Sequence, residues 1–310
     1  MRSEHHDNQV IDGEEFKKAQ AAADAAENLP ADQINTESFY VTQRYERYTD
    51  ENHAVWKALY ERRWEVLEQQ ASNTFISGLK AIRLVPDRVP LLFGEQPDPR
   101  DPSKTIKGIN EYLRPLTGWQ SRAVPGYLPG KAFFSCLSRR EFPTTIIVRP
   151  REKMDYLPEP DIFHDVFGHV PLHADPVFAD FLQTYGKAAL ETDDPYHIER
   201  LGRLFWFTVE FGLIKEDGRL KIYGSGLISS HGESEHALTA PEAPKGVSLE
   251  PSDTSGRLER RPFDLERVCE THFEIDHYQP VLYVLESFEQ LRDAMNKYAE
   301  RVLDEAKTPV

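Results

Sequence analysis

The chain has 310 residues, 39% of them hydrophobic, and its 52 acidic residues outnumber the 37 basic ones to give a net charge of −15. This charge argues against nucleic acid and anionic membrane surfaces as partners, because both are themselves negatively charged. No segment approaches the run of about 18 apolar residues that can cross a bilayer, so we expect no membrane anchor.

The two cysteines, Cys136 and Cys269, belong to no C-x-x-C pair and stand far apart in the sequence. A disulfide framework is therefore not expected, and a reducing compartment fits this cysteine usage. The first ten residues, MRSEHHDNQV, lack the apolar core of a secretion signal. We expect a cytoplasmic protein.

Residues 1–35 are polar and acidic, with an alanine-rich stretch that has helix propensity but almost no large apolar residue to dock it. We expect these residues to form a loosely attached or disordered tail. No internal repeat or long linker divides the remainder, so residues 36–310 are predicted to form one domain.

Helical periodicity dominates that domain. A long amphipathic helix is predicted over 49–73, where the apolar residues follow helical spacing (Val55, Trp56, Leu59, Tyr60, Trp64 and Leu67). Further helices are expected at about 74–82, 103–114, 131–138, 176–190, 195–210 and 288–303. Short strands are expected at 144–148, 221–223 and 281–284, and a Gly/Ser loop at 224–230. The predicted fold class is mainly α with short β-strands.

In the stretch PEPDIFHDVFGHVPLHADP, His164 and His169 stand five positions apart. On an undistorted helix, at about 100° per residue, their side chains would diverge by roughly 140°. We therefore predict a helix that ends at Gly168, with Pro171 preventing its return, so that both imidazoles can face one ion. The spacing, and Asp165 after the first histidine, do not fit the His-Glu-x-x-His pattern of zinc proteases.

Glu210 lies in the run LFWFTVEFGLI, which is apolar on every side and indicates a buried helix. A carboxylate in such a place requires a cation. Two imidazoles and one carboxylate, with other coordination positions open, are the arrangement expected of non-haem Fe(II) oxygenases. A rival cluster is formed by His231, Glu233 and His236, but the helix that begins there is expected to be exposed.

The segments PEPDIFHDVFGHVPL, WFTVEFGL and YGSGLISSHGE closely resemble the pterin-dependent aromatic amino acid hydroxylases, in particular their bacterial, phenylalanine-hydroxylating branch. The resemblance runs from about Tyr40 to the C-terminus. It implies the single-domain catalytic fold of that family over 36–310. It also implies conversion of L-phenylalanine to L-tyrosine with O2 and a tetrahydropterin, at Fe(II) held by His164, His169 and Glu210.

The resemblance also assigns residues to the substrate and the pterin. Arg149, which ends a predicted strand, would hold the substrate carboxylate with its guanidinium fork, helped by Ser229. A Pro-rich segment over 156–160 leads into the helix that is predicted to carry His164. The aromatic ring of the substrate would lie among Pro160, Trp206, Phe211 and Gly226. The pterin would contact Gly126, Leu128, Phe133 and Asp165, the last of which replaces a glutamate of the family.

Assembly and partners follow from the same resemblance. The chain has no room for the regulatory domain or the tetramerising helix of animal relatives, so a monomer is expected. Pterin-recycling enzymes would be indirect partners.

Three alternatives stay open. Tryptophan or another aromatic amino acid is an alternative substrate, because an apolar slot excludes a hydroxyl only weakly. A zinc hydrolase would use the same three ligands with a metal-bound water. An amino acid binding protein would keep the fold without turnover.

Overall fold

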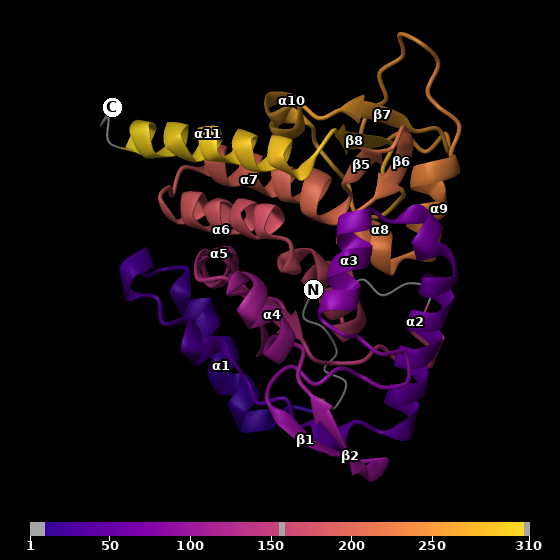
Figure 1. Cartoon of the computed structure of the whole chain (residues 1–310). Helices are drawn as coiled ribbons and strands as arrows, with labels where there is room; N and C mark the ends of the chain where they lie inside the picture. Colours follow the sequence, from indigo (N-terminus) through magenta and orange to yellow (C-terminus); the bar gives the residue numbers. More distant parts are fainter. Residues whose placement is uncertain (1–9, 155–158, 307–310) are drawn as a thin grey trace.

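The computed structural model describes residues 10–154 and 159–306 (Figure 1). Helices predominate and the strands are short, which confirms the predicted fold class. Residues 1–9 of the predicted tail and residues 156–158 of the Pro-rich segment lie outside the described residues. Within the described ranges, no helix combines the length and the apolar character needed to cross a bilayer.

The longest helix, α2 (Asp50–Gln70), confirms the predicted amphipathic helix. Thr49 begins it with a capping box, in which the Asn52 amide donates to the Thr49 hydroxyl and the Thr49 amide donates to the Asn52 side chain. The buried side chains of α2 include Arg63, a charged residue on the face turned to the core. α3 (Asn73–Ala81) follows directly and is capped by Ser72.

Residues 13–26 form a docked helix, α1 (Gly13–Ala26), instead of the predicted loose tail. Ala19, Ala23 and Ala26 are buried, and Ala23 packs in a small apolar cluster that includes residues of the later helix α5 (Gly130–Ser138). Glu15 ties α1 down further by accepting hydrogen bonds from the Thr42 amide and hydroxyl, at 2.6 and 2.8 Å. The prediction of a loose tail was wrong because it assumed that docking needs large apolar residues. The small alanine side chains instead let α1 pack closely against its neighbours.

An antiparallel hairpin of β1 (Glu95–Asp98) and β2 (Asp101–Lys107) occupies the first half of the helix predicted over 103–114. Only the second half is helical, as α4 (Asn110–Thr117). Ile106 and Ile109 are both buried, but Ile106 reaches the core from a strand. Pairing with β1 overrides a short local pattern at this place.

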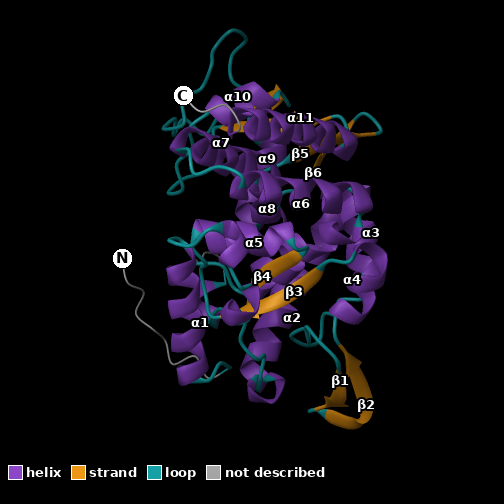
Figure 2. Ribbon diagram, turned by 90° about the vertical axis from the view of Figure 1, so that its left-hand side faces the viewer, coloured by secondary structure: helices purple, strands orange, loops and turns teal. Residues whose placement is uncertain are grey.

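The parallel strands β3 (Gln120–Val124) and β4 (Glu141–Thr145) lie side by side in the middle of the molecule (Figure 2). The predicted helix at 131–138 is confirmed as α5 (Gly130–Ser138), which connects them. β4 begins three residues before the strand predicted at 144–148 and ends at Thr145.

Three helices, α6 (Pro176–Leu190), α7 (Pro195–Phe205) and α11 (Phe288–Ala306), stack in the upper half of Figure 1. α6 packs against both α5 and α11, and α10 (Leu265–Glu270) packs on α7. Asp175 and Asp194 cap α6 and α7, and each is followed by a proline at the first helical position, as the sequence predicted.

A four-stranded sheet completes the fold, in the order β6-β5-β8-β7. Its strands are β5 (Leu213–Glu216), β6 (Arg219–Ile222), β7 (Glu259–Pro262) and β8 (Val281–Leu285). The strands predicted at 221–223 and 281–284 are thereby confirmed. The predicted Gly/Ser loop is instead a short helix, α8 (Ser225–Ser229), followed by α9 (His231–Thr239).

Candidate metal centre

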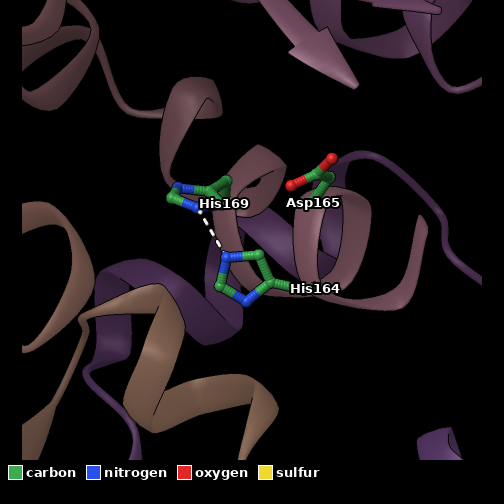
Figure 3. A group of neighbouring side chains, drawn as sticks. All are labelled: His164, Asp165 and His169. Atoms are coloured by element: carbon green, nitrogen blue, oxygen red, sulfur yellow. Dashed lines mark hydrogen bonds between the residues drawn. The ribbon is translucent and has the colours of Figure 1, made fainter. Parts of the chain in front are cut away.

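His164 and His169 lie on one π-helical segment, Phe163–His169. Their Nε2 atoms are 3.2 Å apart, and the two imidazoles face each other in Figure 3. The wider i→i+5 turn of a π-helix brings residues five apart toward one face, which an α-helix does not do. The predicted helix end at Gly168 is therefore wrong, because the chain turns on through His169 into a 3₁₀ segment at Val170–Ala174.

Gly168 has a packing role in place of the predicted helix stop. A Cβ atom at this position would lie 3.1 Å from the Ser225 carbonyl oxygen and 3.2 Å from its Cβ. The glycine thus permits close packing of the π-helix on α8.

Glu210 ends a second π-helical segment, Trp206–Glu210, that continues α7. Its Oε1 is 3.2 Å from His169 Nε2, and its Oε2 is 3.6 Å from His164 Nε2. The structure therefore brings the three predicted ligands together from two separate helices. Glu210 retains 15% exposure of its side chain and His164 20%, so the group is open on one side.

The triangle of donor atoms fits a transition metal ion. Ligands about 2.1 Å from an ion and at right angles are about 3.0 Å apart, close to the observed separations. Without a cation, two nitrogen lone pairs and a carboxylate oxygen would converge on the same point. A bound cation satisfies all three acceptors.

Two serines of α8 contact the predicted ligands. The Ser225 hydroxyl donates to Glu210 Oε2 at 2.6 Å. Ser229 Oγ lies 2.9 Å from His164 Nδ1 and donates its own proton to the Ser225 carbonyl at 2.8 Å. Ser229 can therefore accept only from a protonated Nδ1, which leaves the His164 Nε2 lone pair free for a metal.

Ser229 was predicted as a substrate contact, and its bond to His164 was not foreseen. Ser225 was not predicted at all, since a serine in a Gly/Ser stretch carries no signal of its own.

The electrostatic setting favours neutral imidazole and ionised carboxylate, the forms that bind metals. Burial lowers the pKa of His164 to about 4. Burial alone would raise the pKa of Glu210, but the adjacent His169 and His164 imidazoles and the Ser225 hydroxyl outweigh it and hold this pKa at about 2.

Asp165, predicted to approach the pterin, is a second carboxylate close to the two imidazoles (Figure 3). Its Oδ2 accepts a hydrogen bond of 2.6 Å from the Thr145 amide at the end of β4. Burial raises its pKa to about 7, so the carboxyl is much less acidic than an exposed one. Its anchoring to β4 distinguishes it from Glu210, which faces both ring nitrogens.

Other histidine and carboxylate groups make weaker metal sites. Glu274, Asp276 and His277 lie within ligand distance of one another, but both carboxylates are exposed. Over residues 10–154 and 159–306, no such group forms at the rival cluster of His231 and His236.

Arg149 is buried and forms a two-pronged ion pair with Asp161, Nε to Oδ2 at 2.9 Å and Nη2 to Oδ1 at 2.8 Å. Asp161 also accepts from the His164 amide at 3.0 Å, so one carboxylate connects Arg149 to the π-helix that carries His164. No contact between Asp161 and Arg149 was predicted from the sequence. The signal that could have indicated this contact is that Asp161 stands three residues before His164.

Three of the four residues predicted to contact the substrate ring lie near Glu210. The Trp206 and Phe211 rings are 4.6 Å apart, and a Cβ on Gly226 would lie 3.0 Å from the Phe211 ring. Trp206 is fixed by stacking on Phe273 at 4.4 Å. Pro160 is exposed and directly precedes Asp161.

The predicted pterin residues Gly126, Leu128 and Phe133 lie at and before α5. Phe133 is 5.5 Å from the Phe205 ring, which in turn is 6.3 Å from His169. A Cβ on Gly126 would meet open space. The Leu128 side chain is buried in the small apolar cluster with α1.

Fold and site together define a class: a mainly helical protein whose buried His-His-Glu set can hold one metal ion, the ligand pattern of mononuclear non-haem iron oxygenases. A family profile described as biopterin-dependent aromatic amino acid hydroxylase matches residues 41–307, and the chain belongs to this family.

Individual relatives agree with this assignment. The phenylalanine-4-hydroxylase of Mesorhizobium japonicum is 39% identical over 272 residues, 87% of this chain and 88% of the relative. The phenylalanine-4-hydroxylase of Chromobacterium violaceum is 39% identical over 256 residues, 83% of this chain and 76% of the relative. A crystal structure of the latter enzyme with bound iron(III) and 7,8-dihydrobiopterin has a TM-score of 0.70 at 39% identity and covers 86% of this chain and 87% of that one.

Proposed function

We propose that this chain is a pterin-dependent iron monooxygenase that converts L-phenylalanine to L-tyrosine. The observation that carries the proposal is the convergence of His164, His169 and Glu210 at 3.2 to 3.6 Å in a member of this family. The relatives favour this reading over a zinc hydrolase and over a binding protein without turnover.

The first task of the protein is to hold the metal while leaving positions free. Bound iron and a tetrahydropterin supply the activation of O2. His164, His169 and Glu210 hold the iron from one side, and Ser225 and Ser229 keep two of these ligands in orientation.

The second task is to position the amino acid. Asp161 occupies the Nε and Nη2 atoms of Arg149 and so holds the guanidinium rigid. The edge of the guanidinium that Asp161 leaves free would then attract the substrate carboxylate with little loss of conformational freedom. We place the substrate ring in an apolar slot beside Glu210, bordered by the Trp206 and Phe211 rings and by Gly226. Phenylalanine suits this slot because its ring brings no polar group that needs a partner.

The third task is to seat the pterin. Phe133 offers an aromatic face and is connected to His169 through one intervening ring, that of Phe205. Asp165 adds a polar group near the proposed ligands. Gly126 and Leu128 would contribute contacts through the chain that precedes α5.

The same proposal includes a monomeric, cytoplasmic enzyme whose pterin is regenerated by separate recycling enzymes. Both cysteines are buried and free, which supports a reducing compartment. Light scattering checks the assembly and should give the mass of one chain.

Product analysis after reconstitution tests the proposed activity. Metal-free protein is loaded anaerobically with Fe(II) or Zn(II), mixed with a tetrahydropterin and L-phenylalanine or L-tryptophan, and exposed to O2. We expect tyrosine from phenylalanine only when both iron and pterin are present, and less product from tryptophan. Equal activity with zinc and no pterin requirement would contradict the oxygenase assignment.

A matched pair of variants locates the activity. Glu210→Gln removes the carboxylate of the proposed site and should abolish tyrosine formation. Glu274→Gln alters the exposed group at 274–277 and should leave it unchanged. The reverse result would move the metal site to the surface group.

A further inference from the structure

Arg63 is a buried cation on helix α2. Arg63 is 2% exposed and lies in the second half of α2, among the apolar side chains of the core. Among the described residues, no carboxylate pairs with its guanidinium. Burial lowers the pKa of Arg63 to about 10. A charge kept in such a place at this cost calls for a specific use.

The partners of Arg63 are the end of α8 and the start of α9. Nε donates to the Ile228 carbonyl at 2.7 Å, and Nη2 donates to the Leu227 carbonyl at 3.4 Å. Nη1 lies 3.4 Å from His231 Nδ1, on the first residue of α9. The last carbonyls of a helix lack partners within the helix and carry partial negative charge, so a guanidinium fork both neutralises and clamps them.

α8 depends on tertiary contacts for its helical form. It is five residues long, which is far too short to be stable alone. It packs closely on the π-helix Phe163–His169, where Gly168 meets Ser225. Its orientation therefore depends on contacts from outside, and Arg63 supplies two hydrogen bonds to α8 and a third contact to His231 of α9 from a long, well-capped helix.

The two serines of α8 that contact metal ligands lie on this same clamped turn. Ser225 donates to Glu210 and Ser229 contacts His164. A small rotation of α8 would displace both hydroxyls at once, because Ser229 also donates to the Ser225 carbonyl. Arg63 itself contacts none of the three ligands in any of its hydrogen bonds.

We propose that Arg63 is a positioning residue of the metal centre, which sets Glu210 and His164 through α8 and its serines. The inference rests on the proposed function only in that these residues bind a metal. Loss of the clamp should weaken metal binding and alter the ligand geometry while the rest of the fold remains intact.

Cobalt(II) titration tests this directly, because its visible absorption bands report both affinity and ligand geometry without any turnover. Metal-free full-length protein is titrated with CoCl2 for the wild type, Arg63→Met and Arg63→Lys. We expect about a tenfold or greater loss of affinity and shifted bands in Arg63→Met, in line with other residues that orient metal ligands. Arg63→Lys, which keeps the charge but not the fork, should fall between.

A control separates positioning from general destabilisation. Val302→Ala creates a cavity in the core of α11, far along the chain from α8, and should lower the melting temperature while leaving the cobalt affinity and bands unchanged. If Arg63→Met does not fold, Arg63→Lys decides the matter alone. Affinity and bands equal to those of the wild type in a folded Arg63 variant would overturn the proposal.

A double-mutant cycle tests the route through the serines. In a Ser225→Ala, Ser229→Ala background, Arg63→Lys should cause no further loss of cobalt affinity, because the hydroxyls that carry its influence are gone. A full additive loss would refute the route. If the wild type itself binds no cobalt, the proposed function fails together with the inference, whereas binding that is equal in all variants overturns the inference alone.

Discussion

Arg149 and Arg151 stand two positions apart and differ only in their surroundings. Arg149 is buried against Asp161, while Arg151 pairs with Glu51 and both of those side chains are more than half exposed. Removing one member of a buried pair leaves an uncompensated charge, which costs about 3 to 5 kcal/mol. Exposed pairs contribute little. We predict that Arg149→Met lowers the free energy of unfolding in urea by that amount and Arg151→Met by far less. Similar losses in both would contradict the burial of the Arg149 pair.

Glu233 gives the fold a pH dependence outside the metal site. Burial raises its pKa from 4.5 to about 7, with His277 opposing the shift. Because the folded state keeps the proton longer than the unfolded state, stability falls as pH rises from 4.5 to about 7. The shift corresponds to at most about 3 kcal/mol.

The variant Glu233→Gln isolates this effect. It should be no more stable than the wild type at pH 4.5 and clearly more stable at pH 8, measured by urea unfolding at both values. Glu235→Gln on the same helix should show no such difference, because the Glu235 side chain is 67% exposed. A gain that does not depend on pH would point to a cause other than this carboxyl group.

For single residues, the sequence predicted those functional side chains whose chemistry is unusual for their surroundings. His164, His169 and Glu210 were proposed as ligands because a carboxylate in an apolar run needs a cation beside it, and two imidazoles in a tight motif can share that cation. The contacts of Ser225 with Glu210 and of Asp161 with Arg149 were not predicted, because serine hydroxyls and carboxylates at helix starts are common. Their roles appear only when the chain folds and places them beside a ligand and beside Arg149.

Among the elements, α3 and the 3₁₀ segment Val170–Ala174 depend on one glycine. A Cβ on Gly78 would lie 1.9 Å from the Pro171 carbonyl oxygen. Although alanine is the better helix former, Gly78→Ala should therefore destabilise the protein by about 1 to 3 kcal/mol. Gly202→Ala in α7, where nothing lies within 4 Å, should stabilise it by up to about 1 kcal/mol. Thermal unfolding compares the two, and a stabilising Gly78→Ala would refute the close contact.

Helix α1 makes an independent test of docking by small residues. Ala23 is fully buried and Ala21 is exposed on the same helix. Ala23→Gln should detach α1 and speed hydrogen exchange over residues 13–26, whereas Ala21→Gln should change little. Equal exchange in both variants would mean that α1 is not held by this face.

Elements were predicted well where the periodicity was long and poorly where tertiary contacts decide. The patterns of α2, α6 and α11 extend over several turns. The β1–β2 hairpin, α8 and the π-helix are short, and each owes its form to a partner: the paired strand, Arg63, or the packing of Gly168 on Ser225. No local pattern indicates such partners.

For the whole molecule, distant segments meet at one place. The proposed metal ligands come from 163–169 and 206–210, the serines that contact them come from α8, and Arg63, which contacts α8, comes from α2. The fold and activity were predicted through resemblance to a family, because periodicity alone does not show which helices adjoin. The ligand set, in contrast, followed from residue chemistry before any resemblance was used.

The central claim is that His164, His169 and Glu210 hold one iron ion and leave its remaining positions free of protein donors. A crystal structure of the iron-loaded protein tests it most directly. We predict the two Nε2 atoms and the Glu210 carboxylate at about 2.0 to 2.2 Å from a single ion, with only water in the other positions. An ion enclosed by a fourth protein donor such as Asp165, or bound away from these three side chains, would contradict the account.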